Sequence, residues 1–311
     1  MAAQVETMFY VRNTPWHGLG TRVEEALSSE EALKMAGLDW KVIQKPLDTF
    51  DGIPVPGYVA NVRETDQKVL GVVSTQYSVV QNTDAFAFTD EMLGKGVRYE
   101  TAGSLAGGKR VWILAKLPNQ YIVKGDKISP YLVFSNTHDG SGSIKVALTP
   151  IRVVCNNTLC LALNTAQRSW STKHTGDIGG RLEDAKETLF RAEDYMDQLG
   201  KEIEVLHGIR IPKAQAEKMI TQLIPVPEKA SSQQEKNIIS QRQDIMYRYM
   251  HAPDLRTLPE NGYRLLNAVS DFAGHAKPLR MTKSYQDNLF AKAIDGNQLI
   301  DKGYQMIKQA A

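Results

Sequence analysis

Tyr131 to Leu163, YLVFSNTHDGSGSIKVALTPIRVVCNNTLCLAL, is the stretch that decides the fold. It opens with a short β-prone run, which is followed by a cluster of loop-forming residues, Ser135 to Ser143. A second, largely apolar strand is predicted over Ile144 to Cys155. The polar run Asn156 to Thr158 then offers side-chain oxygens to cap a helix that begins near Leu159. The pattern predicts a strand, a loop, a second strand and the start of a helix.

Both connections of this stretch carry candidate ligand-binding residues. His138 and Asp139 lie on the Gly/Ser-rich loop, where they would supply acid–base groups to an enzyme. Asn156, Asn157 and Thr158, at a helix start, would hold an anion, as phosphate-handling sites do. The alternative is structural, because Asp and Gly are common turn residues. We expect no metal site, no cofactor and no catalytic residue, since the chain lacks HExxH, GxSxG and a Cys/His ligand set.

The composition indicates a globular protein without membrane segments. Hydrophobic residues make up 42% and charged residues 23% of 311 residues, enough for one large or two ordinary domains. No apolar run approaches the roughly 18 residues that a membrane-spanning helix needs. The two cysteines, Cys155 and Cys160, are too few for a disulfide framework, and we expect them to be buried and reduced. No secretion signal is recognised at the N-terminus, so we expect a location in the cytoplasm of a bacterial host cell.

The small net charge of +2 conceals a strong asymmetry along the chain. Residues 1–94 hold 7 Lys/Arg against 13 Asp/Glu, whereas residues 95–175 hold 11 against 3. Residues 176–311 hold 19 of each kind. A concentrated positive segment attracts phosphates, which makes nucleic acid the first partner to consider. The alternative, which the sequence leaves open, is that adjacent antiparallel strands have a solvated basic face.

The order of predicted elements favours an α+β fold. Mainly antiparallel strands in a β-meander, among them Val69 to Ser74, are predicted for the N-terminal half, with two helices, one of them capped by Asn82 to Asp84; helices alone are predicted for the C-terminal half. Residues 1–180 are predicted to form an α+β domain that contains the antiparallel sheet and the basic segment. A long amphipathic helix is predicted from Arg181 to about His207, and the helices expected after it include residues 213–223 and 283–293. We expect residues 181–311 to form a helical region that packs on the first domain or mediates assembly.

The candidate nucleic-acid contacts share positive charge or an aromatic ring suited to base stacking. A basic hairpin tip follows the turn Ala106-Gly107-Gly108, where a strand, not the helix of a phosphate-binding P-loop, comes next. Polar, basic and aromatic residues occur together in residues 167–176, so this loop is a second candidate, although its tryptophan could instead fold back onto the body. The predicted contacts are Lys109, Arg110, Lys145, Arg152, Arg168, Trp170, Lys173 and His174.

Two motifs resemble a known family. TPIRVVCNNTLCLAL at Thr149 to Leu163 and NTPWHGLGT at Asn13 to Thr21 are similar to the phage/plasmid-like family of proteins of unknown function, over most of the chain. This resemblance implies a mobile-element setting but no established chemistry. In architecture alone, the predicted meander, basic segment and helical tail resemble phage annealing proteins of the RecT and Redβ kind, which bind single-stranded DNA and assemble into rings or filaments.

The leading hypothesis is a nucleic-acid-binding protein of phage or plasmid DNA metabolism, with single-stranded DNA the favoured partner in annealing or recombination. A homo-oligomer is a candidate assembly, and no membrane partner is expected. Two alternatives stay open. One is a phage-encoded interaction protein that inhibits host defence, and the other is a phosphate-handling enzyme built on the His138 loop.

Overall fold

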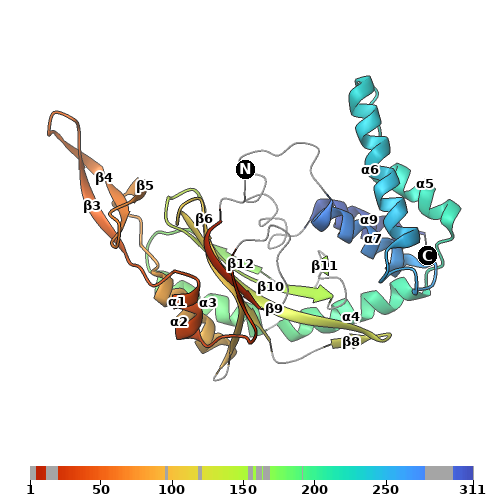
Figure 1. Cartoon of the computed structure of the whole chain (residues 1–311), viewed down its shortest axis with the longest axis horizontal. Helices are drawn as coiled ribbons and strands as arrows, with labels where there is room; N and C mark the ends of the chain where they lie inside the picture. Colours follow the sequence, from red (N-terminus) through yellow and green to blue (C-terminus); the bar gives the residue numbers. More distant parts are fainter. Residues whose placement is uncertain are drawn as a thin grey trace. The chain divides into compact units, whose positions relative to one another are not determined.

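A computed structural model of the chain describes residues 5–11, 20–94, 97–117, 121–152, 157–158, 163, 169–190, 192–276 and 297–310 (Figure 1). The fold is α+β with antiparallel sheets, as predicted: the N-terminal half is mostly strands and the C-terminal half is helical. Backbone contacts divide the chain into two compact units. Unit 1 contains residues 1–118, 131–148 and 168–192, and unit 2 contains residues 119–130, 149–167 and 193–311.

The main sheet has the strand order β11-β10-β9-β7-β6-β1-β2, with β12 also paired to β10 and β8 to β9. Its β1 and β2 pair in parallel, whereas β6 to β7 and β7 to β9 are antiparallel. The strands of this sheet are β1 (Val5–Val11), β2 (Thr21–Val23), β6 (Arg98–Leu105), β7 (Arg110–Lys116), β8 (Tyr121–Val123), β9 (Asp126–Thr137), β10 (Ile144–Arg152), β11 (Asn157–Thr158) and β12 (Ser169–Thr172).

A second, three-stranded antiparallel sheet forms a separate arm of unit 1. It contains β3 (Val42–Asp48), β4 (Pro54–Arg63) and β5 (Val69–Ser74), in that order. The β3–β4 hairpin extends away from α1 and α2 of the same unit (Figure 1). Phe50 lies in the turn at its tip and is fully exposed.

Three helices cover one face of the main sheet in unit 1. They are α1 (Ser29–Met35), α2 (Asn82–Leu93) and α3 (Ile178–Phe190). Together with the sheet they enclose an apolar cluster, which we call the core cluster. Phe88 of α2 and Phe134 of β9 lie at its centre, with ring centroids 5.7 Å apart. Burial of such rings is the main driving force for attaching helices to a sheet.

The start of α2 differs by one residue from the predicted cap. The polar residues Asn82 to Asp84 were expected to precede the helix, but the helix begins at Asn82 and Gln81 is its N-cap. The backbone N–H of Gln81 donates to the Asp84 carboxylate at 3.0 Å in a capping box. Asn82 is thereby left free to turn its amide into the protein, where it meets His138.

Unit 2 is mainly helical. It contains α4 (Ala192–Gly208), α5 (Lys213–Leu223), α6 (Ser232–His251), α7 (Gly262–His275) and α9 (Gln298–Lys308). The long helix predicted from Arg181 to His207 corresponds to α3 and α4, which lie on either side of residue 191. The expected helix over residues 283–293, both cysteines and residues 13–19 of the N-terminal motif lie outside the described residues.

Candidate nucleic-acid interface

The basic tip of the β6–β7 hairpin is held by a tight turn. Gly107 and Gly108 have φ of 71° and 87°, a conformation that glycine adopts without steric cost. Lys109 follows this turn, and its carbonyl accepts a 2.7 Å hydrogen bond from the N–H of His138. Arg110 is the first residue of β7. The turn therefore fixes the backbone of both predicted phosphate contacts.

Arg110 and Lys145 project from the same face of the main sheet. Side chains alternate between the two faces along a strand, and the neighbouring residues Val111 and Val146 belong to the core cluster. Arg110 and Lys145 therefore point away from that cluster, and both are half-buried. The structure thus brings these two predicted residues to one face.

This face of the sheet is not an open platform. Trp112 of β7 and Ser135 of β9 lie opposite each other on it, and they are only 8% and 5% exposed. A nucleic acid lying flat across the strands would have to displace whatever buries them. Phosphates would instead meet the basic side chains at the strand ends, near the β6–β7 turn and near β12.

The candidate residues of β12 point in different directions. Trp170 pairs with Val146 of β10, on the side of the core cluster, and its half-buried ring packs against that cluster. Lys173, directly after the strand, is exposed. The tryptophan therefore occupies the folded-back position, and Lys173 is the exposed predicted contact at this end of β12.

Five predicted residues lie near the end of β10 or outside the described residues. Arg152 is the last residue of β10, and its backbone pairs with Asn157 of β11. Asn157 and Thr158 form the short strand β11, and the helix start predicted near Leu159 lies outside the described residues. Arg168 and Asn156 lie outside the described residues.

His138 is buried at the end of β9, with no exposed surface. Its Nε2 lies 3.0 Å from Oδ1 of Asn82, and its carbonyl accepts a 2.8 Å hydrogen bond from Asn61. The ring of Trp40 lies edge-on to the imidazole, with centroids 5.4 Å apart. Burial above all, followed by the proximity of His174, lowers the pKa of His138 to about 3. His138 is therefore neutral at physiological pH.

His174 is also buried, and its side chain is 3% exposed. Its ring stacks on Tyr77 with centroids 4.5 Å apart, and its Nδ1 lies 3.2 Å from the Ser78 carbonyl. Burial lowers the pKa of His174. The hydroxyl of Tyr77 donates to the Thr137 carbonyl at 2.5 Å, and burial raises the pKa of that phenol, with Asp139 adding to the effect. The stacking partner of His174 is thus a tyrosine of this chain.

Asp139 shapes the loop that follows His138. Its carboxylate accepts hydrogen bonds from the N–H and the hydroxyl of Ser141, at 2.9 and 2.6 Å. The loop rests on β5 at Gly71, where a side-chain Cβ would lie 2.5 Å from the Cα of Asp139. This contact requires glycine. The carboxylate therefore acts as a turn former in this structure, which is the structural alternative given above.

Sequence reasoning missed the partners of the two histidines. Asn82, Asn136 and Tyr77 are buried and hydrogen-bonded around them. In the sequence, Asn82 is a helix-cap residue, whereas Asn136 falls in a predicted loop because β9 extends further than expected. The one available signal was the density of polar residues in Ser135 to His138, which is unusual for the end of a buried strand.

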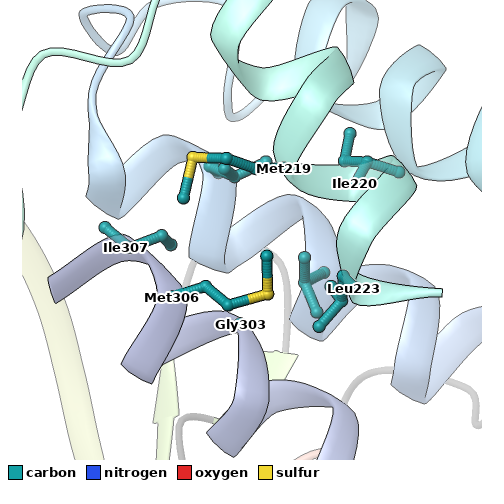
Figure 2. Close-up of a pocket in the computed structure, with 8 residues that line it drawn as sticks. Met219, Ile220, Leu223, Gly303, Met306 and Ile307 are labelled. Atoms are coloured by element: carbon teal, nitrogen blue, oxygen red, sulfur yellow. The ribbon is translucent and has the colours of Figure 1, made fainter. Parts of the chain in front are cut away.

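Metal sites, membrane-spanning helices and pockets are the other features to consider in the described residues. No three His, Cys, Asp or Glu side chains among them are grouped to hold a metal ion. The helices in the same part of the chain include none with the length and hydropathy to cross a membrane. In unit 2, a pocket of about 220 Å³, its open mouth included, is bordered by side chains of α5, α7 and α9 (Figure 2). Met219 and Met306 are among these apolar side chains, so the pocket suits an apolar group and not a phosphate.

Comparison with known proteins places this chain in a family. The model of a domain of unknown function, DUF932, matches residues 69–294. The chain belongs to the DUF932 family. The DUF932 match includes every predicted nucleic-acid contact and both buried histidines, whereas β1, β3 and β4 precede it. No curated protein and no solved structure matches the chain.

Proposed function

We propose that this DUF932 protein binds single-stranded nucleic acid, DNA above all, through the basic residues of its segment 95–175. The supporting observation is that Arg110 and Lys145 share one sheet face, with Lys109 at the hairpin tip and Lys173 exposed after β12. The segment holds 11 Lys/Arg against 3 Asp/Glu, a field that attracts phosphates.

The proposed binding is electrostatic, not based on stacking. Trp170 is half-buried against the core cluster, and His174 is buried in a stack with Tyr77, so the proposal assigns base stacking to neither ring. Contacts made mostly to phosphates carry little sequence information, and they weaken steeply as salt rises. We therefore expect sequence-tolerant binding.

A salt series with charge-neutralised variants tests the proposal. Fluorescence anisotropy with a labelled single strand would be measured for the wild type and for Lys109→Gln/Arg110→Gln/Lys173→Gln. Each single-strand phosphate contact contributes about 0.7 to the slope of log K against log salt, so the triple variant should reduce the slope by about 2. A matched control, Lys218→Gln/Lys229→Gln/Lys236→Gln, removes three exposed lysines of unit 2 and should leave the slope unchanged.

Two results would contradict nucleic-acid binding at this place. One is the absence of binding by the wild type at low salt. The other is an equal loss of slope in the triple variant and the unit 2 control, which would show a diffuse charge effect.

The setting that we propose is the DNA metabolism of a phage or plasmid, with strand annealing as the activity. Its support is the resemblance of the Thr149 to Leu163 motif to the phage/plasmid-like family, together with the antiparallel sheet and basic segment. An annealing assay with complementary labelled oligonucleotides would examine this step separately. If the protein binds the strands but does not accelerate annealing, the proposed nucleic-acid binding stands and the proposed annealing activity is contradicted.

A second candidate function is an interaction module, for which inhibition of a host defence protein is one role. The observation that favours it is the β3–β4 hairpin, where Phe50 is fully exposed and Ile53 is 62% exposed at the tip. Exposed apolar groups of this kind mark association surfaces. Light scattering over a concentration series would compare the wild type with Phe50→Ser/Ile53→Ser. Self-association lost in the variant, with DNA binding retained, would favour this candidate, and a monomer at every concentration would count against self-association.

A further inference from the structure

In the part of the chain that the structure describes, three buried acceptor atoms around the end of β9 have no hydrogen-bond donor. They are Oδ1 of Asn136, Nδ1 of His138 and Nε2 of His174, on side chains that are 0%, 0% and 3% exposed. Buried polar groups in proteins nearly always have a partner, since leaving one without costs about 1–3 kcal/mol. Three such atoms in one place indicate a ligand.

The hydrogen-bond network fixes which ring nitrogen of each histidine carries the proton. The amide nitrogen of Asn82 donates to the Leu38 carbonyl, so its oxygen faces His138, and Nε2 of His138 must be the donor. Nδ1 of His174 lies by the Ser78 carbonyl, which can only accept, so this nitrogen is also protonated. The remaining ring nitrogens, Nδ1 of His138 and Nε2 of His174, are therefore unprotonated, and each carries a lone pair.

The third acceptor is assigned in the same way. The amide nitrogen of Asn136 donates to the Val80 carbonyl at 2.9 Å, which leaves its oxygen as the atom without a partner. The site therefore offers two imidazole lone pairs and one amide oxygen, and no hydrogen-bond donor among these three atoms.

All three side chains contact the stretch from Ser78 to Asn82, which leads into α2. His174 contacts Ser78, Asn136 contacts Val80, and His138 contacts Asn82. Tyr77 connects the two histidines, because its ring stacks on His174 while its hydroxyl bonds the carbonyl of Thr137, between Asn136 and His138.

We propose that His138 and His174 bind a divalent transition-metal ion of the zinc class through Nδ1 and Nε2, with Oδ1 of Asn136 as a third, weaker ligand. Neutral imidazole is a preferred ligand of such ions. In metal sites, the other ring nitrogen of a ligating histidine usually donates to an oxygen, as both histidines do here.

This site is independent of the proposed phosphate contacts, because it shares no residue with them. His174 was predicted as a nucleic-acid contact from the sequence, but it is buried. The sequence did not reveal it, since its two histidines come from different elements and no ligand motif joins them. Zinc bonded to imidazole requires about 2.0–2.1 Å, so binding should draw the two rings toward each other.

Metal titration of the whole chain tests the proposal without nucleic acid. The purified protein would be stripped with a chelator and titrated with Zn²⁺, and retained metal would be measured by mass spectrometry after gel filtration. We expect about one ion per chain, lost in His138→Gln and in His174→Gln. Removing the outer hydrogen bond with Asn82→Leu should weaken binding about 10–100-fold. The matched control is His251→Gln, an exposed histidine of α6, which should bind like the wild type.

Co²⁺ as a spectroscopic probe and the melting temperature give independent readings. Visible absorption of bound Co²⁺ should report nitrogen and oxygen ligands, and Zn²⁺ should raise the melting temperature of the wild type but not of the two histidine variants. If a variant fails to fold, the wild-type titration still decides. The proposal is overturned if the wild type retains no ion at micromolar free Zn²⁺ or if both histidine variants bind normally. A high-resolution crystal structure with only water at the three atoms, grown with Zn²⁺, would also overturn it.

Discussion

Arg63 of β4 holds two carboxylates at once. Its guanidinium donates to both oxygens of Glu6 at 2.9 Å and to Asp66 at 2.7 and 2.9 Å, and it lies over the ring of Trp40. The side chain of Arg63 is only 10% exposed, whereas the carboxylates are partly solvated. Arg63→Met should lower the free energy of unfolding by about 1–2 kcal/mol, because it leaves the partly buried Glu6 with only the longer contacts to Lys68 and Ser104. Urea denaturation at pH 7 measures this.

The control for Arg63 is an ion pair in full contact with solvent. Lys34 pairs with Glu30 one turn away on α1, and both side chains are well exposed. Surface pairs of this kind contribute little. Lys34→Met should therefore leave the urea midpoint nearly unchanged, and an equal effect of the two substitutions would contradict the importance of burial at Arg63.

The same network predicts an acid-sensitive step. Hydrogen bonds from Arg63 lower the pKa of Glu6, and they lower the pKa of Asp66 to about 2. Because the folded values lie below the unfolded ones, this stabilisation is present above about pH 4.5 and is lost as the pH falls toward 2. Urea midpoints measured from pH 7 to pH 3 should fall more steeply for the wild type than for Arg63→Met. Parallel curves would count against the network as the cause.

Arg264 of α7 is buried, and its hydrogen-bond partners among the described residues are backbone carbonyls. At 7% exposed, it donates to the carbonyls of Tyr249, Leu258 and Met250, two of which lie in the last turn of α6. A cation is favourable at a helix C-terminus, and here it also satisfies carbonyls that have no helical partner. Arg264→Met should cost about 2–4 kcal/mol in urea denaturation. Arg256→Met, at an exposed position, should have little effect.

At the residue scale, the sequence shows which side chains can act as acids or bases, but it does not show whether they are buried or what they contact. His138 and Asp139 stand out in the sequence because their side chains titrate. Whether such a side chain faces water depends on β9, which extends to Thr137 and carries His138 inside. The side chains that contact the buried ring of His138, Asn82 and Trp40, come from distant parts of the chain, and no local sequence pattern predicts such contacts.

At the scale of elements, β12 allows stability and binding to be separated. Trp170 packs against the core cluster, so Trp170→Ala should lower the free energy of unfolding by about 2–3 kcal/mol. The folded variant should bind single-stranded DNA within about twofold of the wild type, because the ring takes no part in the proposed contacts. A loss of 1–3 kcal/mol in binding energy is the usual effect of removing a stacking ring, and it would contradict this assignment. Anisotropy and thermal unfolding on the same sample provide both values.

Elements with strong local signals are predictable from the sequence. The bounds of β5 and α5, Val69–Ser74 and Lys213–Leu223, agree with the prediction residue for residue, because a β-branched run and an amphipathic period identify each one. The short strand β11 was not predictable. Its two residues take their conformation from β10, and a polar Asn-Asn-Thr run is equally suited to capping a helix.

At the scale of the whole molecule, the predicted boundary between residues 180 and 181 can be tested with a fragment. Residues 1–180 alone would keep β8 and the start of β9 but lose Tyr263, whose hydroxyl donates to Asp126 at 2.8 Å within unit 2. We expect this fragment to bind the dye ANS and to melt without a sharp transition. A cooperative melt like that of the full chain would favour an independent domain ending at residue 180.

The interleaving of the two units along the chain also affects synthesis. Asp126 and Tyr263 are separated by 137 positions, so the ribosome makes the β8–β9 hairpin long before α7. At about 5–20 residues per second, the hairpin waits roughly 7–27 s for this partner. During that interval its apolar side chains are open to other nascent chains. Bound chaperones that cover the hairpin, or fast translation between Asp126 and Tyr263, would therefore protect the yield of folded protein.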